Sequence, residues 1–226
     1  MSELRLAFPA NVIAGRGRLT AQDVALLKEE MFPNGLEDAE GAVLLFALHN
    51  SCRPACPEWG EFFVDALTRF IVDGVQPEGR LDETNALWLE RMLAADGIIA
   101  TELELKLLMN VLATAASVPD SLRVFALSQL RYAIHSGLGA YAARRRGHQK
   151  GISAADIEFA RTVVDAGAGD PGTASPAIHR VLLSIDAVAL PGMNDGTWLA
   201  FLYTTRTGHT DRPEKAHRAT RRRIAA

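Results

Sequence analysis

The sequence predicts an all-α fold: a multi-helix bundle of short antiparallel helical hairpins with an internal duplication. Two observations favour this class. Apolar residues recur at helical spacing along most of the chain, and turns containing Gly or Pro separate the periodic segments at short intervals. A third observation excludes the main alternative, because no segment has the sustained alternation of β-branched residues that half-buried strands require.

The clearest helix is expected over residues 58–74. Its apolar residues follow the i, i+3, i+4, i+7 spacing of one buried stripe, and its charged residues recur at intervals of four on the opposite side. The stripe consists of Trp59, Phe62, Phe63, Ala66, Leu67, Phe70 and Ile71. This pattern predicts a core helix with one solvated face.

The other helices are justified by start signals and by the turns that precede them. Thr20 with Asp23, Thr101 with Glu104 and Ser153 with Asp156 each pair a capping residue with an acid three positions later. Turns "FPNG", "QPEG", "SVPD" and "GAGDPG" precede four more helices. In chain order we expect helices over 20–31, 38–50, 82–94, 101–116, 120–135, 153–166, 175–189 and 197–203. Because the turns are short, neighbouring helices should pack as antiparallel hairpins.

An internal duplication is indicated by two similar stretches. The stretch "GRLTAQDVALLKEE" (17–30) aligns with "KGISAADIEFARTV" (150–163), and both start with a cap followed by an acid. The similarity continues in two further pairs of segments: 39–50 with 174–186, and 58–66 with 197–205. We therefore divide the chain into an N-terminal segment (1–16), a main helical bundle (17–136), a basic linker (137–150), a partial second helical repeat (151–205) and a basic, disordered tail (206–226).

Composition points to a globular chain without a membrane span. Hydrophobic residues make up 48% of the 226 residues and charged residues 23%. The longest uncharged run, 107–119, is shorter than the roughly 20 apolar residues that cross a bilayer. No basic leader precedes the first apolar run, and the two cysteines fit a reducing compartment, so we expect a cytoplasmic protein.

Charge is distributed unevenly along the chain. Residues 1–140 hold 11 Lys and Arg against 19 Asp and Glu, whereas residues 141–226 hold 13 against 8. The basic end contains two Arg-Arg-Arg clusters, at 144–146 and 221–223, but no aromatic residues interleave with them. We interpret both clusters as solvated linker and tail, and nucleic-acid binding is not expected.

The stretch "HNSCRPACPEW" (49–59) raises the question of a metal or redox site. His49, Cys52 and Cys56 would supply three ligands, but zinc sites with strong sequence signals use two close pairs. The corresponding loop of the predicted second copy, 186–198, has neither Cys nor His. We therefore interpret the stretch as a proline-broken loop between two helices.

The stretch "ADGIIATE" (95–102) resembles the tellurite-resistance protein B-like (TerB-like) family over about 20–135. A looser version of the motif, "FPNGLEDAE" (32–40), occurs earlier in the chain. The resemblance implies a compact duplicated helical bundle, a role linked to bacterial stress and membrane-associated complexes, and divalent-cation binding by acidic residues. It does not account for the partial second repeat or for the basic tail.

Asp96 and Glu102 are the candidate cation ligands. Two carboxylates that approach across a tight turn, together with loop carbonyls, can hold a hard cation. The alternative interpretation is structural: Gly97 ends one helix, and Glu102 favours the dipole of the next. The pattern of an EF-hand calcium loop is absent from the sequence.

These observations favour a non-enzymatic helical interaction module that can bind a divalent cation. Nucleophile elbows, zinc-protease motifs and phosphate-binding glycine loops are all absent from the sequence. The alternative is a metal-dependent enzyme whose carboxylates converge from several helices. We also expect a homo-oligomer or a protein partner if the shortened second repeat leaves an apolar face uncovered.

Overall fold

The computed structural model describes residues 3–145, 150–168 and 174–207, and in these ranges it contains eleven α-helices and no strand. The all-α prediction is confirmed. The helices are α1 (Glu3–Arg16), α2 (Ala21–Leu26), α3 (Ala39–Ser51), α4 (Pro57–Arg69), α5 (Glu83–Leu93), α6 (Glu102–Thr114), α7 (Asp120–His135), α8 (Gly139–Arg144), α9 (Ala154–Asp165), α10 (Pro176–Val188) and α11 (Trp198–Thr207). Two π-helical turns, η1 (Leu27–Met31) and η2 (Phe70–Gly74), extend α2 and α4, and a 3₁₀ turn, η3 (Pro191–Met193), precedes α11.

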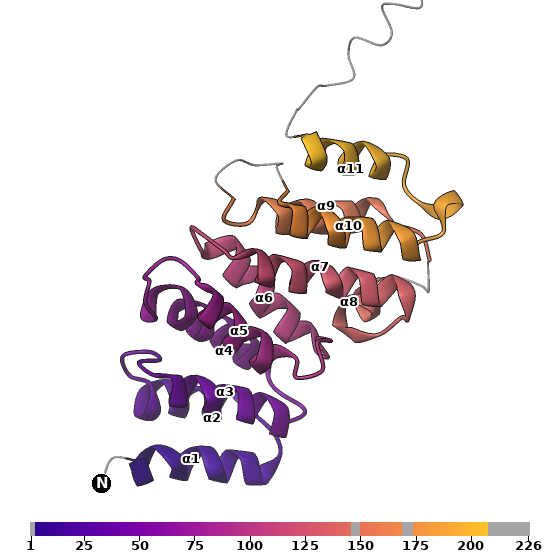
Figure 1. The fold of residues 1–226 in the computed structure, drawn as a ribbon. Helices are drawn as coiled ribbons and strands as arrows, with labels where there is room; N and C mark the ends of the chain where they lie inside the picture. Colours follow the sequence, from indigo (N-terminus) through magenta and orange to yellow (C-terminus); the bar gives the residue numbers. More distant parts are fainter. Residues whose placement is uncertain (1–2, 146–149, 169–173, 208–226) are drawn as a thin grey trace, which may run out of the picture.

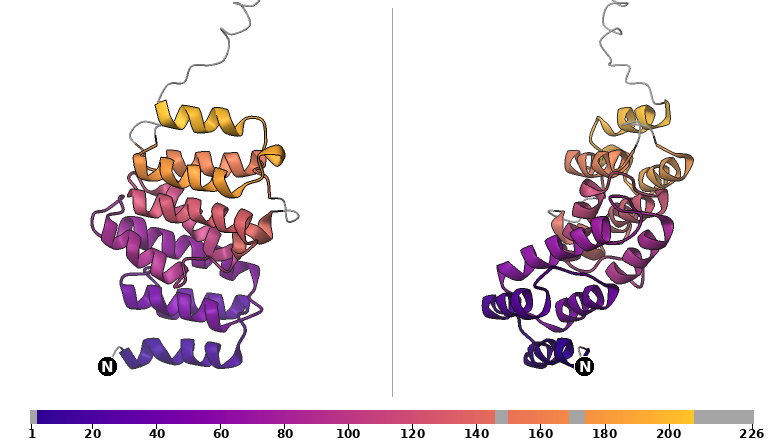
Figure 2. Two further views of the ribbon diagram at one scale, coloured as in Figure 1. Left: turned by 45° about the vertical axis from the view of Figure 1, so that its right-hand side comes forward. Right: turned by 90° about the vertical axis from the view of Figure 1, so that its left-hand side faces the viewer.

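The helices stack in layers, with α1 at one end and α11 at the other (Figures 1 and 2). Helix α7 is central, because it packs against α5, α8, α9 and α10. Helix α4 packs against α2 and α6. One continuous cluster of buried apolar side chains extends from Ala10 in α1 to Leu202 in α11.

Three helical hairpins are closed by backbone hydrogen bonds between the segment that enters the first helix and the segment that leaves the second. In the α2–α3 hairpin the Cys56 amide donates to the Leu19 carbonyl (3.1 Å), and in the α5–α6 hairpin the Leu81 amide donates to the Ser117 carbonyl (2.9 Å). In the α9–α10 hairpin the Leu190 amide donates to the Lys150 carbonyl (2.8 Å). Because the middle hairpin has the same closure, this feature does not single out the two predicted copies, and the duplication stays a prediction.

Two segments that were not among the predicted helices contain helices. The N-terminal segment 1–16 contains α1, with Pro9 inside it and with Ala10 and Ile13 buried. A proline inside a helix removes one backbone hydrogen bond, which is why the segment does not look helical in the sequence.

The interpretation of 137–150 as a linker is wrong for its first half. Residues 139–144 form α8, whose Ala140 and Tyr141 are buried and which packs against α6 and α7. Gly139 allows this approach: it has a φ of +87°, and a Cβ at its position would lie 2.8 Å from the Ile98 side chain. The Ala140 amide donates to the Ile99 carbonyl (2.7 Å) at the same contact.

The predicted tail, 206–226, lies largely outside the described residues, and only Arg206 and Thr207, which end α11, belong to them. Among the described helices, none combines the length and the hydrophobicity that crossing a bilayer requires.

Candidate functional site

The predicted cation ligands lie in the turn between α5 and α6. Asp96 is exposed, and its Oδ1 accepts a hydrogen bond from the Ile98 amide (3.1 Å). Glu102 is the first residue of α6 and is also exposed. Within the described residues no group of three or more His, Cys, Asp or Glu side chains is arranged to hold a metal ion. The pair alone would supply two ligands, so cation binding here stays a prediction.

A buried glutamine, which the sequence did not point to, holds this turn in place. The Gln129 side chain of α7 accepts a hydrogen bond from the Ile99 amide (2.9 Å) and donates one to the Gly97 carbonyl (3.0 Å). Because Gln129 is buried, both bonds are shielded from water. The turn that carries Asp96 is therefore fixed from α7 and, through Ile98 and Ile99, from α8.

His49 does not join the two cysteines. Its Nε2 lies 3.1 Å from Thr101 Oγ1 and 3.9 Å from Glu104 Oε1, and its ring packs on Phe63 with centroids 4.8 Å apart. Burial lowers the pKa of His49 below its usual value, although the nearby Glu104 carboxylate opposes this shift. The histidine thus joins α3 to the start of α6.

The two cysteines have structural positions. Cys52 is buried, and its thiol donates a hydrogen bond to the Ile13 carbonyl (3.7 Å). Burial raises the pKa of the Cys52 thiol, which disfavours the thiolate that metal binding and redox chemistry need. Cys56 is the N-cap residue of α4. The loop between α3 and α4 is residues 52–56, since 49–51 end α3 and 57–59 start α4.

Every buried carboxylate of the described ranges belongs to a capping box. The three acids are Asp23, Glu104 and Asp156, and each accepts a hydrogen bond from the backbone amide of its N-cap residue. Each also has a basic neighbour: Arg16 for Asp23, His49 for Glu104 and Arg145 for Asp156. The acids of the three helix start signals predicted from the sequence are therefore also the buried carboxylates of the described ranges.

Asp156 has the most complete set of partners. It is 1% exposed and accepts hydrogen bonds from the Tyr141 hydroxyl (3.0 Å), from Arg145 (2.9 Å) and from both the amide and the hydroxyl of Ser153 (2.8 Å each). Burial and the adjacent Asp156 charge raise the pKa of Tyr141. Both oxygens of this buried carboxylate have hydrogen-bond partners, and through Tyr141 and Arg145 it positions α8 and the residue after it against α9.

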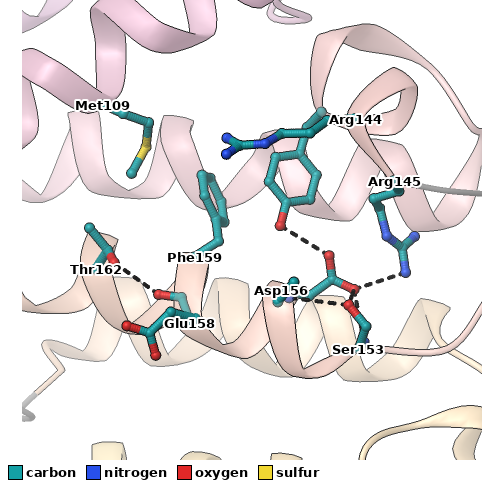
Figure 3. Close-up of a pocket in the computed structure, with 10 residues that line it drawn as sticks. Met109, Arg144, Arg145, Ser153, Asp156, Glu158, Phe159 and Thr162 are labelled. Atoms are coloured by element: carbon teal, nitrogen blue, oxygen red, sulfur yellow. Dashed lines mark hydrogen bonds and ion pairs between the residues drawn. The ribbon is translucent and has the colours of Figure 1, made fainter.

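A cavity of about 650 Å³ lies beside this cluster, between α6, α8 and α9 (Figure 3). Met109 and the aromatic rings of Tyr141 and Phe159 form its apolar part, and these two rings pack with centroids 4.4 Å apart. The exposed side chain of Arg144 lines the same cavity, and Figure 3 shows its guanidinium turned toward Phe159.

Two arginines and two acids line the cavity: Arg144, Arg145, Asp156 and Glu158. Arg145 is paired with Asp156, and Glu158 lies 3.8 Å from Arg161. Arg144 has neither an ion pair nor a hydrogen bond with any part of the chain that the structure describes. Arg144 is therefore the one charged side chain of this lining that has no ion pair within the described residues, and we call the hollow the Arg144 cavity.

A second hollow, of about 750 Å³, lies between η1, the loop after it and α4. Three exposed acids of α4 and η2 line it together with Lys28 and Arg69. Lys28 lies over the Phe62 ring, 5.3 Å from its centroid. Charges of both signs alternate along this solvated face, so it does not select one kind of ligand.

Sequence reasoning missed the Arg144 cavity. The Ser153 and Asp156 start signal was recognised, but Arg144 was assigned to a linker and Phe159 was one apolar residue among many. Met109, Tyr141 and Phe159 come from three helices, and no local pattern shows that these helices meet.

No protein-family model matches the chain, and no curated protein and no solved structure matches it either. The resemblance to the TerB-like family therefore stays a prediction.

Proposed function

We propose that the protein is a non-enzymatic helical interaction module that associates through the outer face of α11. The partners of the three buried acids argue against catalysis. Each of these carboxylates is hydrogen-bonded within a capping box, so none is arranged as a general acid or base. The metal-dependent enzyme that the sequence left open would need carboxylates that converge on one point, and no feature of the described residues favours it.

The proposal is based on α11, the last helix of the stack. Helix α11 buries Trp198, Phe201 and Leu202 against α9 and α10, while Leu199 on its outer side is 70% exposed. The helix carries no charged residue before Arg206. Stacked helical arrays usually end in a polar outer face, which keeps them soluble. An apolar end therefore calls for a partner.

The partner that we propose for this face is a second copy of the chain. Two identical faces can meet around a two-fold axis, which closes the contact and leaves no open end. Because the outer face of α11 is uncharged up to Arg206, no like charges oppose one another at its centre.

Sedimentation velocity over a hundredfold range of concentration tests this proposal. We expect the wild-type chain to shift from monomer to dimer and the Leu199→Glu variant to remain monomeric, since an unpaired buried charge opposes association. Leu87→Glu is the matched control, because Leu87 is an exposed leucine on α5 and its variant should dimerise like the wild type. A monomeric wild-type chain at every concentration would contradict the proposal.

Divalent-cation binding at Asp96 and Glu102 is part of the same proposal, as are a bacterial stress role and a cytoplasmic location. Support for the cation comes from two exposed carboxylates near a turn that Gln129 fixes, and the two free thiols agree with the location. Titration calorimetry with calcium, magnesium, manganese and zinc should give heat with the wild type and none with Asp96→Ala. Asp65→Ala, on the exposed face of α4, should behave as the wild type.

A further inference from the structure

We infer that the Arg144 cavity binds a small organic anion, with an aromatic or compact aliphatic body and one acidic group. The inference is independent of self-association through α11. Its basis is the combination of a half-open hollow that is partly apolar with one guanidinium that has no ion pair in the described residues.

The size of the cavity fits such a ligand. Its volume of about 650 Å³ lies within the range of roughly 300–1,000 Å³ that is usual for small-molecule sites. Such sites are mainly apolar and fix orientation with a few polar groups. Eight of the ten lining residues belong to α6, α8 and α9, and the other two, Arg145 and Ser153, directly flank α8 and α9.

The apolar part of the cavity favours a ligand whose main part is aromatic or aliphatic. Phe159 and Tyr141 present two packed aromatic rings, and Met109 faces the same space from α6. A planar ring can pack against the Phe159 face and make a sulfur contact with Met109. The Tyr141 hydroxyl is not available to the ligand, because it donates to Asp156 (3.0 Å).

The charged residues of the lining favour an acidic group on the ligand. Arg145 and Glu158 both line the cavity, but each has an oppositely charged partner. Arg144 has none among the described residues, so it can donate two parallel hydrogen bonds to a carboxylate, a sulfonate or a phosphate. Ser153 and Ala155 place the N-terminal end of α9 at the same cavity, and the positive end of the helix dipole adds to the attraction.

The probe that tests this assignment is 1-anilinonaphthalene-8-sulfonate, a fluorescent aromatic anion. Its uncharged analogue, N-phenyl-1-naphthylamine, has the same rings without the sulfonate. We expect the wild-type chain to bind the anionic probe at one saturable site. Arg144→Gln should weaken that binding by at least about tenfold, because a charge-assisted bidentate contact is lost. Arg180→Gln, on the exposed side of α10, should change it by less than about twofold.

A second pair of variants removes folding as an explanation. Ala154 and Ala155 are both exposed in the first turn of α9, but only Ala155 lines the cavity. An added acid in a first turn stabilises a helix, so Ala154→Asp and Ala155→Asp should both fold, which circular dichroism checks. Ala155→Asp should repel the anionic probe, whereas Ala154→Asp should bind it like the wild type.

The uncharged probe separates the two parts of the assignment. It should bind Arg144→Gln as well as it binds the wild type, since only the acidic group contacts the guanidinium. Anionic-probe binding that is unchanged in Arg144→Gln, equal losses in the Ala154→Asp and Ala155→Asp variants, or no saturable binding by the wild type would each overturn the inference.

Discussion

At the scale of single residues, the buried carboxylates of the described ranges lie where local chain geometry already supplies hydrogen-bond donors. Asp23 shows why this is stable. Burial by itself would raise the pKa of Asp23, but the hydrogen bonds from the Thr20 side chain and backbone and from Arg16 outweigh burial and hold the pKa below its usual value. The carboxylate thus stays ionised and capped at neutral pH. A folded-state pKa below the unfolded one stabilises the fold above the unfolded value, and this stability is lost as the pH falls through the folded value.

His49 gives a testable dependence of stability on pH. Burial and Arg53 lower its pKa, and Glu104 offsets part of that shift, so the folded chain takes up the His49 proton at a lower pH than the unfolded chain does. The unfolded chain therefore binds more protons once the pH drops toward the ordinary value of 6.5. Stability is full above that value and falls below it, by at most about 1.4 kcal/mol per pH unit for one proton.

Urea unfolding between pH 5 and pH 8 measures this effect. We expect His49→Gln to flatten the slope between pH 7 and pH 5 relative to the wild type, because glutamine can still bond to Thr101 but does not titrate. His135→Gln is the matched control, since His135 is exposed and water surrounds it in both states. A slope in His49→Gln as steep as in the wild type would show that other groups cause the pH dependence.

At the scale of helices, the sequence predicted those helices whose start signals and apolar stripes lie close together in the chain. It missed helices whose position depends on distant contacts. Helix α6 was found because Thr101, Glu104 and an apolar stripe all lie within it. Helix α8 was missed because six residues are too short for periodicity to be read, and its arginines suggested solvent exposure. Its position is set by Gly139 against Ile98, a contact between residues 41 positions apart in the sequence. The Arg144 cavity depends on α8, so it could not be predicted either.

Gly139 should therefore be less replaceable than the glycine two positions before it. Both Gly137 and Gly139 have positive φ, +69° and +87°, so alanine costs about 1 kcal/mol at either position. Only at Gly139 would the new Cβ also meet Ile98 and the Ile99 carbonyl, which adds about 1–3 kcal/mol. Chemical denaturation should show Gly139→Ala to be the less stable variant. Equal losses would mean that α8 can shift away from the turn at little cost.

At the scale of the whole molecule, the core does not follow the division of the chain that the predicted duplication suggested. The predicted boundary near 137–150 separates an acidic body from a basic end, yet α7 on one side packs extensively against α10 on the other. Ile178, Leu182 and Ile185 of α10 are completely buried. Similarity between local segments does not show which helices pack together, so the predicted duplication was a poor guide to a domain boundary.

The continuity of the core predicts that both ends of the stack unfold together. Trp59 in α4 and Trp198 in α11 are buried on opposite sides of the predicted boundary and serve as separate fluorescence probes. One variant would keep only Trp59 and another only Trp198, with phenylalanine at the other two tryptophan positions. We expect each variant to show the same urea midpoint by fluorescence as by far-ultraviolet circular dichroism, since coincident probes mark one cooperative transition.

Adding Leu182→Ala to either variant should lower the midpoint of both probes, because a cavity of this kind costs about 2–5 kcal/mol. If Leu182→Ala lowered the midpoint at Trp198 and left Trp59 unchanged, residues 151–205 would fold as a unit of their own. The α7–α10 contact would then be a surface between two domains and not part of a single core.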